Sequence, residues 1–326
     1  MDSFPYTPLQ TGRELRLLKL AGGEENSGLK GELIHFNLDR GPDYSALSYV
    51  WGSKIAPTKI ECNGYQVEIT ENLADALRHL RYQSESRHLW VDALCINQQD
   101  ADEKSHQVAL MKDIYAHAQE VDVWLGLDEE GIAVRLFAEA ENLLASLEAK
   151  VEQDVESLDG AQWQCFSAAP FFILPRLSLL FKREYFTRTW VIQEVGLANR
   201  PVAHCGKATV NFNKLGLFAM AFLKYFRPTL SSLGYLKEFE CVSSLYQTYL
   251  PQPGPERLYD IIHRTRLNQV TDSRDKVYAF ISHPSARQDV GGFPYSGEGM
   301  PHGGNMTEED IRWRALSIIF APTNVT

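Results

Sequence analysis

Two short apolar segments on either side of an amphipathic helix constrain the fold of this chain more than any other feature. Residues 89–91 and 121–125 are rich in β-branched and aromatic side chains and are bounded by polar residues or glycine, which is typical of buried strands. Between them, apolar side chains recur at helical spacing over residues 108–118, and Asp100, with Glu103 three residues later, is suited to cap that helix. The sequence therefore predicts a β-α-β unit with parallel strands and a right-handed crossover.

Polar side chains follow the first of these strands directly. They are Asp92, Cys95, Asn97 and Gln98. In sheets of this kind, ligands bind outside the carboxyl ends of the strands. We therefore look for function at this end of the sheet first.

Strands are predicted before this unit, and mostly helices after it. The expected strands are residues 15–20, 31–36, 44–52 and 201–206, with a hairpin over 60–69 that turns at Asn63-Gly64. Thr70 is suited to cap a helix that follows the hairpin. Further helical patterns cover residues 132–147, 183–199, much of 213–280, and 308–320, with loops at 150–162 and 284–309. The apolar residues 166–181 contain two prolines and receive no assignment.

We expect an α/β protein with two parts. The first is a domain over residues 1–212, and the second is a mostly helical extension over 213–326 that carries a glycine- and proline-rich loop and packs on the first.

Composition excludes several classes of protein. A net charge of −10 makes nucleic acid an unlikely partner, because phosphate binding needs a basic face. The five cysteines are scattered and show no C-x-x-C pair, which favours reduced thiols. The N-terminus lacks the pattern of a signal peptide, and no apolar run approaches the ~20 residues that span a bilayer. We expect a cytoplasmic protein without a membrane segment.

The common catalytic motifs are missing from the sequence. The nine histidines show no H-E-x-x-H or other metal-binding spacing, and no strand-to-helix junction carries a glycine-rich phosphate loop. Cys95 has no histidine in a dyad arrangement, so we do not expect it to be a nucleophile. No metal and no resident cofactor are expected.

Several long motifs, in one order, resemble a known family. They lie at residues 44–52, 72–77, 89–98, 107–111, 114–115, 124–126 and 185–195, and the later segment 272–278 carries Ser273 where proline is usual. This order resembles the fungal heterokaryon incompatibility (HET) family, over about residues 44–199. The resemblance implies a role in non-self recognition and regulated cell death.

The same resemblance implies a distant relation to TIR domains, whose flavodoxin-like fold often hydrolyses NAD. The expected fold is therefore a mainly parallel, flavodoxin/TIR-like sheet flanked by helices, with extra N-terminal β elements. TIR enzymes carry their catalytic glutamate in a Trp-Cys-x-x-Glu-Leu motif on a helix. Trp190 and Glu194 have that spacing, with Val191 in place of the cysteine and Val195 in place of the leucine.

Cleavage of the nicotinamide–ribose bond passes through an oxocarbenium-like centre, which a carboxylate stabilises. Glu194 is the expected carboxylate, and NAD would be a substrate rather than a cofactor. Trp190, on the same helix face, would stack on a ring, and Arg188 would pair with a phosphate. The opposite wall of the site would be formed by Ser48, Tyr49, Trp51, Gly52, Asp92 and Asn97.

Structural roles are open for the same residues. Glu194 could form a buried ion pair with Arg188, Trp190 could belong to the core, and Asp92 could hydrogen-bond to the 44–52 segment. If so, the chain would be a non-catalytic signalling module that associates with itself or with a sensor protein, or an inactive member of the family.

Overall fold

The computed structural model describes residues 4–10, 12–53, 55, 57–153, 169–248 and 265. The predicted loop from residue 154 to 162, and the helices and loop predicted beyond residue 248, lie outside the described residues. The chain divides into two compact units, residues 1–129 with 197–209, and residues 130–196 with 210–326. The domain boundary that the sequence indicates at residue 212 stays a prediction.

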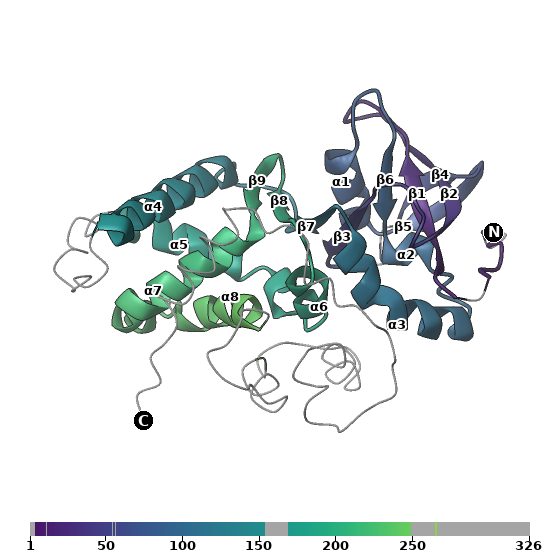
Figure 1. The fold of residues 1–326 in the computed structure, drawn as a ribbon. Coiled ribbons are helices and arrows are strands. Elements are labelled where there is room, and N and C mark those ends of the chain that lie inside the picture. Colours follow the sequence, from purple (N-terminus) through teal and green to yellow (C-terminus); the bar gives the residue numbers. More distant parts are fainter. Residues whose placement is uncertain are drawn as a thin grey trace, which may run out of the picture. The chain divides into compact units, whose positions relative to one another are not determined.

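The described strands form one mixed sheet of nine strands in the order β5-β4-β2-β1-β6-β3-β7-β8-β9 (Figure 1). Their bounds are β1 Glu14–Leu20, β2 Leu29–Asn37, β3 Ser45–Tyr49, β4 Thr58–Cys62, β5 Tyr65–Ile69, β6 Arg87–Trp90, β7 Glu120–Trp124, β8 Pro201–Cys205 and β9 Ala208–Asn211. With helices in both units, this confirms the α/β class. The sequence missed β9, and β1, β2, β4 and β5 are the extra N-terminal strands.

The central strand of the parallel region is β3, which is buried at all five positions. It pairs in parallel with β6 on one side and with β7 on the other, and β7 pairs in parallel with β8. The two strands of the predicted β-α-β unit, β6 and β7, are therefore parallel as expected, but β3 lies between them. A strand without a solvated face belongs in the interior of a sheet, and β3 meets that condition.

Capping residues determine where two helices of the first unit begin. Its helices are α1 Glu71–Leu80, α2 Asp92–Cys95 and α3 Ala101–His117. Thr70 caps α1 by accepting a 3.3 Å hydrogen bond from the Leu73 N–H. Asp100 caps α3 through two 3.0 Å bonds from the N–H groups of Asp102 and Glu103. The hairpin turn is also confirmed, since Asn63 and Gly64 have the positive φ values of 51° and 81° that such turns need.

A buried arginine ties the N-terminal segment, β1, α2 and α3 together. The side chain of Arg16 is 1% exposed and pairs with both carboxylate oxygens of Glu103, at 2.7 and 3.0 Å. It also donates to the carbonyls of Cys95 and Thr7. Glu103 thus turns toward Arg16 and the Asn97 N–H, so it does not complete the capping box with Asp100. Burial alone would raise the pKa of Glu103, but the hydrogen bonds from Arg16 and Asn97 lower it.

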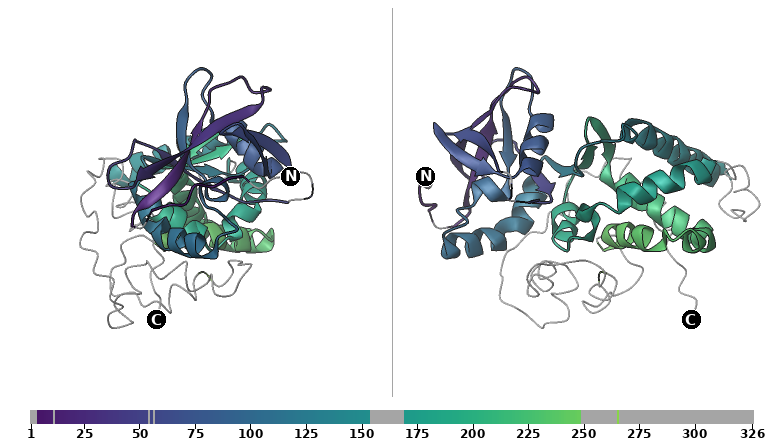
Figure 2. Two further views of the ribbon diagram at one scale, coloured as in Figure 1. Left: turned by 90° about the vertical axis from the view of Figure 1, so that its right-hand side faces the viewer. Right: turned by 180° about the vertical axis from the view of Figure 1, so that it is seen from behind.

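Helices build the second unit (Figure 2). They are α4 Ala133–Gln153, α5 Ala169–Phe181, the 3-10 helix η2 Glu184–Thr187, α6 Val191–Gly196, α7 Phe212–Ser232 and α8 Leu236–Gln247. The described part of the predicted extension, α7 and α8, packs on α4, α5 and α6. The rings of Phe181, Phe186, Phe222 and Phe239 meet in this core. Within the described ranges, no helix is long and apolar enough to cross a bilayer.

Two predictions in this unit were wrong. The continuous helix expected over residues 183–199 is instead η2 and the six-residue α6, separated by Arg188 in an extended conformation with ψ at 133°. The Thr187 hydroxyl donates to the Glu184 carbonyl at 2.8 Å, and such local bonds compete with helix continuation. Helix α4 also extends to Gln153, into the predicted loop. Residues 169–181, which the sequence left unassigned, form α5.

Replacement of Arg16 by leucine tests this buried ion pair. The change leaves the Glu103 carboxylate without its main partner, and we expect a loss of about 3–5 kcal/mol in unfolding free energy, measured with urea at pH 7. Because the folded-state pKa of Glu103 is lowered, its contribution is present above the unfolded-state pKa and disappears as the pH falls through the folded value. The difference between wild type and variant should therefore shrink in acid. Lys19→Met, at an exposed position of the same strand, is the control and should stay within about 0.5 kcal/mol. An equal effect of both variants would contradict the role of Arg16.

Candidate functional site

At the carboxyl ends of β3 and β6, the side chains of Trp51 and Asp92 meet. The Trp51 indole N–H donates to the Asp92 carboxylate over 2.7 Å, and the other Asp92 oxygen accepts from the Ala93 N–H. Gln98 donates to the Asp92 carbonyl at 2.9 Å. The structural alternative considered for Asp92, a hydrogen bond to the 44–52 segment, is therefore observed.

Asn72, at the start of α1, links the ends of β3 and β7. Its amide donates to the Val50 carbonyl at 2.6 Å, and its side-chain oxygen accepts from the Trp124 indole at 3.0 Å. Gly52 has a φ of +75°, and a Cβ there would lie 3.2 Å from the Asn72 Cβ. Asn72 was not among the site residues predicted from the sequence. The available signal was its position in segment 72–77, one of the motifs that resemble the HET family.

The other predicted site residues of the first unit differ in burial and in their hydrogen bonds. Ser48 and Tyr49 are buried within β3, while Gly52 is exposed. Asn97 accepts from the Gln99 N–H at 3.2 Å and so shapes the turn before α3.

The remaining three predicted residues belong to the second unit. Glu194, on α6, is 3% exposed, and its carboxylate lies 3.9 Å from the Arg188 guanidinium. Trp190 is half-buried and precedes α6, and its carbonyl accepts from the N–H groups of Gln193 and Glu194. It therefore opens the first turn of α6, one i,i+4 hydrogen bond before Glu194. Six of the nine predicted residues thus lie on the first unit and three on the second, and the ion pair of Glu194 with Arg188 is present.

Cys95 has none of the properties of a nucleophile. Its side chain is fully buried, and burial raises its pKa to about 12. Its sulfur accepts from the Val91 N–H at 3.3 Å. The thiolate, which is the reactive form, is therefore strongly disfavoured.

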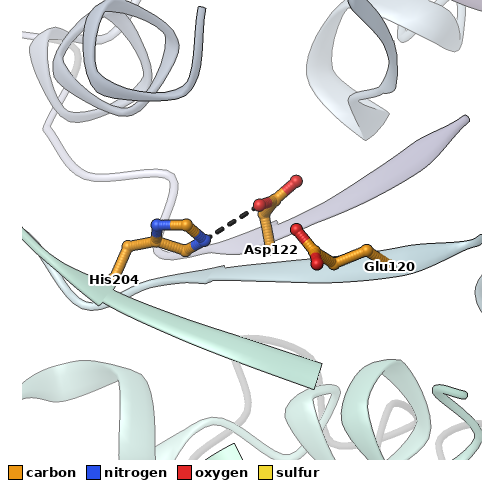
Figure 3. Close-up of side chains that lie close together, drawn as sticks. All are labelled: Glu120, Asp122 and His204. Atoms are coloured by element: carbon orange, nitrogen blue, oxygen red, sulfur yellow. Dashed lines mark ion pairs between the residues drawn. The ribbon is translucent and has the colours of Figure 1, made fainter. Parts of the chain in front are cut away.

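A cluster of titratable side chains, which we call the charged cluster, lies elsewhere in the first unit, at Glu120, Asp122 and His204 (Figure 3). The imidazole Nε2 of His204 faces Asp122 Oδ1 at 2.9 Å, and Asp122 is fully buried. Arg87 reaches the other Asp122 oxygen at 2.6 Å, and Arg200 lies 3.2 Å from Glu120. Sequence spacing did not reveal this group, because β7 and β8 are far apart along the chain.

Much of the region that contains the candidate site residues is similar to known proteins. Residues 44–194 match the family model described as heterokaryon incompatibility protein (HET). The chain is also 32% identical over 201 residues to heterokaryon incompatibility protein 6, OR allele, from Neurospora crassa. Residues 44–194 are therefore similar to the HET family. The match with the Neurospora protein covers 52% of this chain but 30% of that relative, and no solved structure matches.

The HET segment runs from the residue before β3 to Glu194 in α6, so it includes residues of both compact units. Within it, Trp51, Asp92, Asn72 and Trp124 are linked in pairs by side-chain hydrogen bonds. These residues lie in four of the motifs that the sequence resemblance rested on. At these positions, the HET motifs therefore join neighbouring strand ends.

Removal of the Asn72 amide tests this view. Asn72→Ala leaves the Trp124 indole N–H and the Val50 carbonyl without these hydrogen-bond partners. Each lost partner of a buried polar group costs about 1–3 kcal/mol, so we expect a total loss of roughly 2–4 kcal/mol in denaturant unfolding. Glu71→Ala, one residue earlier and exposed, is the control and should cost less than about 1 kcal/mol. A shift in Trp fluorescence of the folded state should accompany Asn72→Ala alone. Equal stability of the two variants would show that Asn72 does not hold the strand ends.

Proposed function

We propose that this chain acts in fungal non-self recognition, as an effector of an incompatibility response that ends in regulated cell death. The proposal rests on the HET match over residues 44–194 and on the similarity to heterokaryon incompatibility protein 6 from Neurospora crassa. Since the chain matches 30% of that relative, the proposal concerns the part the two proteins share.

The biochemical activity that we propose is hydrolysis of NAD at the nicotinamide–ribose bond. Strand order is the observation that carries it. The parallel strands lie in the order β6-β3-β7-β8, which is 2-1-3-4 along the chain. This order is that of the first four strands in flavodoxin-like sheets, the fold to which TIR domains belong. Glu194 lies on α6, between the third parallel strand, β7, and the fourth, β8.

In this proposal, Glu194 stabilises the positive charge that develops on the ribose as nicotinamide leaves. A carboxylate that is 3% exposed interacts strongly with such charge, because little water screens it. Arg188 lies 3.9 Å from this carboxylate in the free protein and, being 21% exposed, would turn toward a substrate phosphate when NAD binds. Nicotinamide is a good leaving group, so the reaction needs no general acid.

Measurement of nicotinamide release by the concentrated protein tests this activity. We expect Glu194→Gln to lower the rate by about 10²–10³-fold, because it keeps the shape of the side chain and removes the charge. Glu184→Gln, on the exposed side of η2, is the matched control and should keep the wild-type rate. The measurement is made under conditions where a TIR enzyme is active. Equal rates of nicotinamide release by the wild type and by Glu194→Gln would contradict the proposal that this chain hydrolyses NAD.

A second candidate is a signalling module without catalytic activity, which acts by self-association or by recruiting a sensor protein. The pairing of the proposed site residues favours it, since Glu194 lies beside Arg188 and Trp51 bonds to Asp92. In this case, Glu194→Gln should remain toxic when expressed in a fungal host. Loss of toxicity by a variant that folds normally, judged by circular dichroism and thermal unfolding, would contradict the signalling module.

A further inference from the structure

The charged cluster on β7 and β8 contains two buried polar atoms that lack a hydrogen bond. Among the described residues, neither Asp122 Oδ1 nor His204 Nε2 has a hydrogen-bond partner. They lie 2.9 Å apart, but their orientation is not that of a hydrogen bond. The side chain of Asp122 is 0% exposed and that of His204 is 13% exposed. A buried carboxylate oxygen left in this state is costly, so it marks a place where a ligand would lower the free energy.

From this geometry, we infer that Glu120, Asp122 and His204 bind a divalent transition-metal ion of the Zn²⁺ class. One ligand atom from each residue lies within 4.8 Å of the other two. Around a tetrahedral zinc ion with bonds of about 2.0–2.2 Å, neighbouring ligand atoms are about 3.3 Å apart. Asp122 Oδ1 and His204 Nε2 are already close to that separation. Glu120 is 20% exposed and can approach by rotation of its side chain.

The arginines of the cluster contact both carboxylates, and Arg87 Nη2 also lies 3.6 Å from Glu120 Oε1. Arg87 Nη2 lies 2.6 Å from Asp122 Oδ2 and also donates to the Ser45 hydroxyl. Its other terminal nitrogen donates to the Leu80 carbonyl. Arg200 lies 3.2 Å from Glu120 Oε2. Hydrogen-bonded partners of this kind orient the ligands in established metal sites. The arginines therefore hold the carboxylates in place while Asp122 Oδ1 faces His204.

The charges in the cluster decide which metal fits. The two guanidinium groups already balance the two carboxylates, so net negative charge does not attract the ion. Ca²⁺ and Mg²⁺ depend on oxygen-rich, negatively charged sites, whereas Zn²⁺ also gains from an imidazole nitrogen. The ion would have three protein ligands and an open position.

Zinc titration of the EDTA-treated full-length protein by isothermal calorimetry tests the site. We expect one Zn²⁺ per chain, and an affinity about tenfold or more lower in His204→Gln and in Glu120→Gln. His106→Gln is the matched control, because His106 is exposed on α3 and lies outside the cluster. Calcium and magnesium should bind at least tenfold more weakly than zinc. Equal zinc affinity in wild type and His204→Gln would overturn the inference, and the charged side chains would then form only a structural ion-pair network.

The Co²⁺ form of the wild-type protein supplies a test that does not depend on the folding of a variant. Coordination by one nitrogen and two carboxylates gives d–d absorption without the charge-transfer bands of a thiolate. Such bands would assign the metal to a cysteine and overturn the inference. A spectrum of the hydrated Co²⁺ ion alone would also overturn the inference.

Discussion

Complete burial of β3 is the constraint on which the first unit depends. Every residue of this strand is buried, and it pairs in parallel on both sides. Beyond the carboxyl ends of this strand and its neighbours, side chains satisfy polar groups that would be costly if they were buried without a partner. Asn72 and Asp92 provide these partners, and each of them binds an indole N–H. The same residues thus complete the core and form the end of the sheet where ligands usually bind.

Buried charges hold the parts of this unit in register. Arg16 joins four segments through Glu103 and two backbone carbonyls, and Arg87 joins β6, β3, β7 and the end of α1. Each guanidinium offers five donors in a planar arrangement, so one buried arginine can replace several backbone partners. Such groups contribute little to net stability, but the loss of one partner leaves an uncompensated charge. Their main effect is to specify one arrangement of the strands and helices.

Signals from neighbouring residues predicted the helix caps and the hairpin turn. Contacts between residues far apart in sequence decided the strand order and several side-chain partners. The caps at Thr70 and Asp100 and the turn at Asn63-Gly64 depend on neighbours within a few residues, so the sequence was sufficient. Glu103 fits a capping box equally well, yet it binds Arg16, which lies 87 positions away. The position of β3 between β6 and β7 likewise depends on strand pairing between distant residues. The approach of His204 to Asp122 depends on the same kind of long-range pairing, which a local sequence pattern does not reveal. For the candidate site, the sequence indicated the pair of Glu194 with Arg188 and the bond of Asp92 to the 44–52 segment, but not the link that Asn72 makes.

The ion pair of Glu194 shows why burial alone does not separate enzyme from signalling module. A carboxylate that is 3% exposed needs a cation nearby in either case, and Arg188 supplies it. At 3.9 Å the contact is longer than a charge-assisted hydrogen bond, which is usually about 2.7–2.9 Å. The Glu194 carboxylate thus forms an ion pair with Arg188 at a distance beyond that of an ordinary charge-assisted hydrogen bond. Its burial means that any partner it meets interacts in a medium of low dielectric, where a single charge has a large effect.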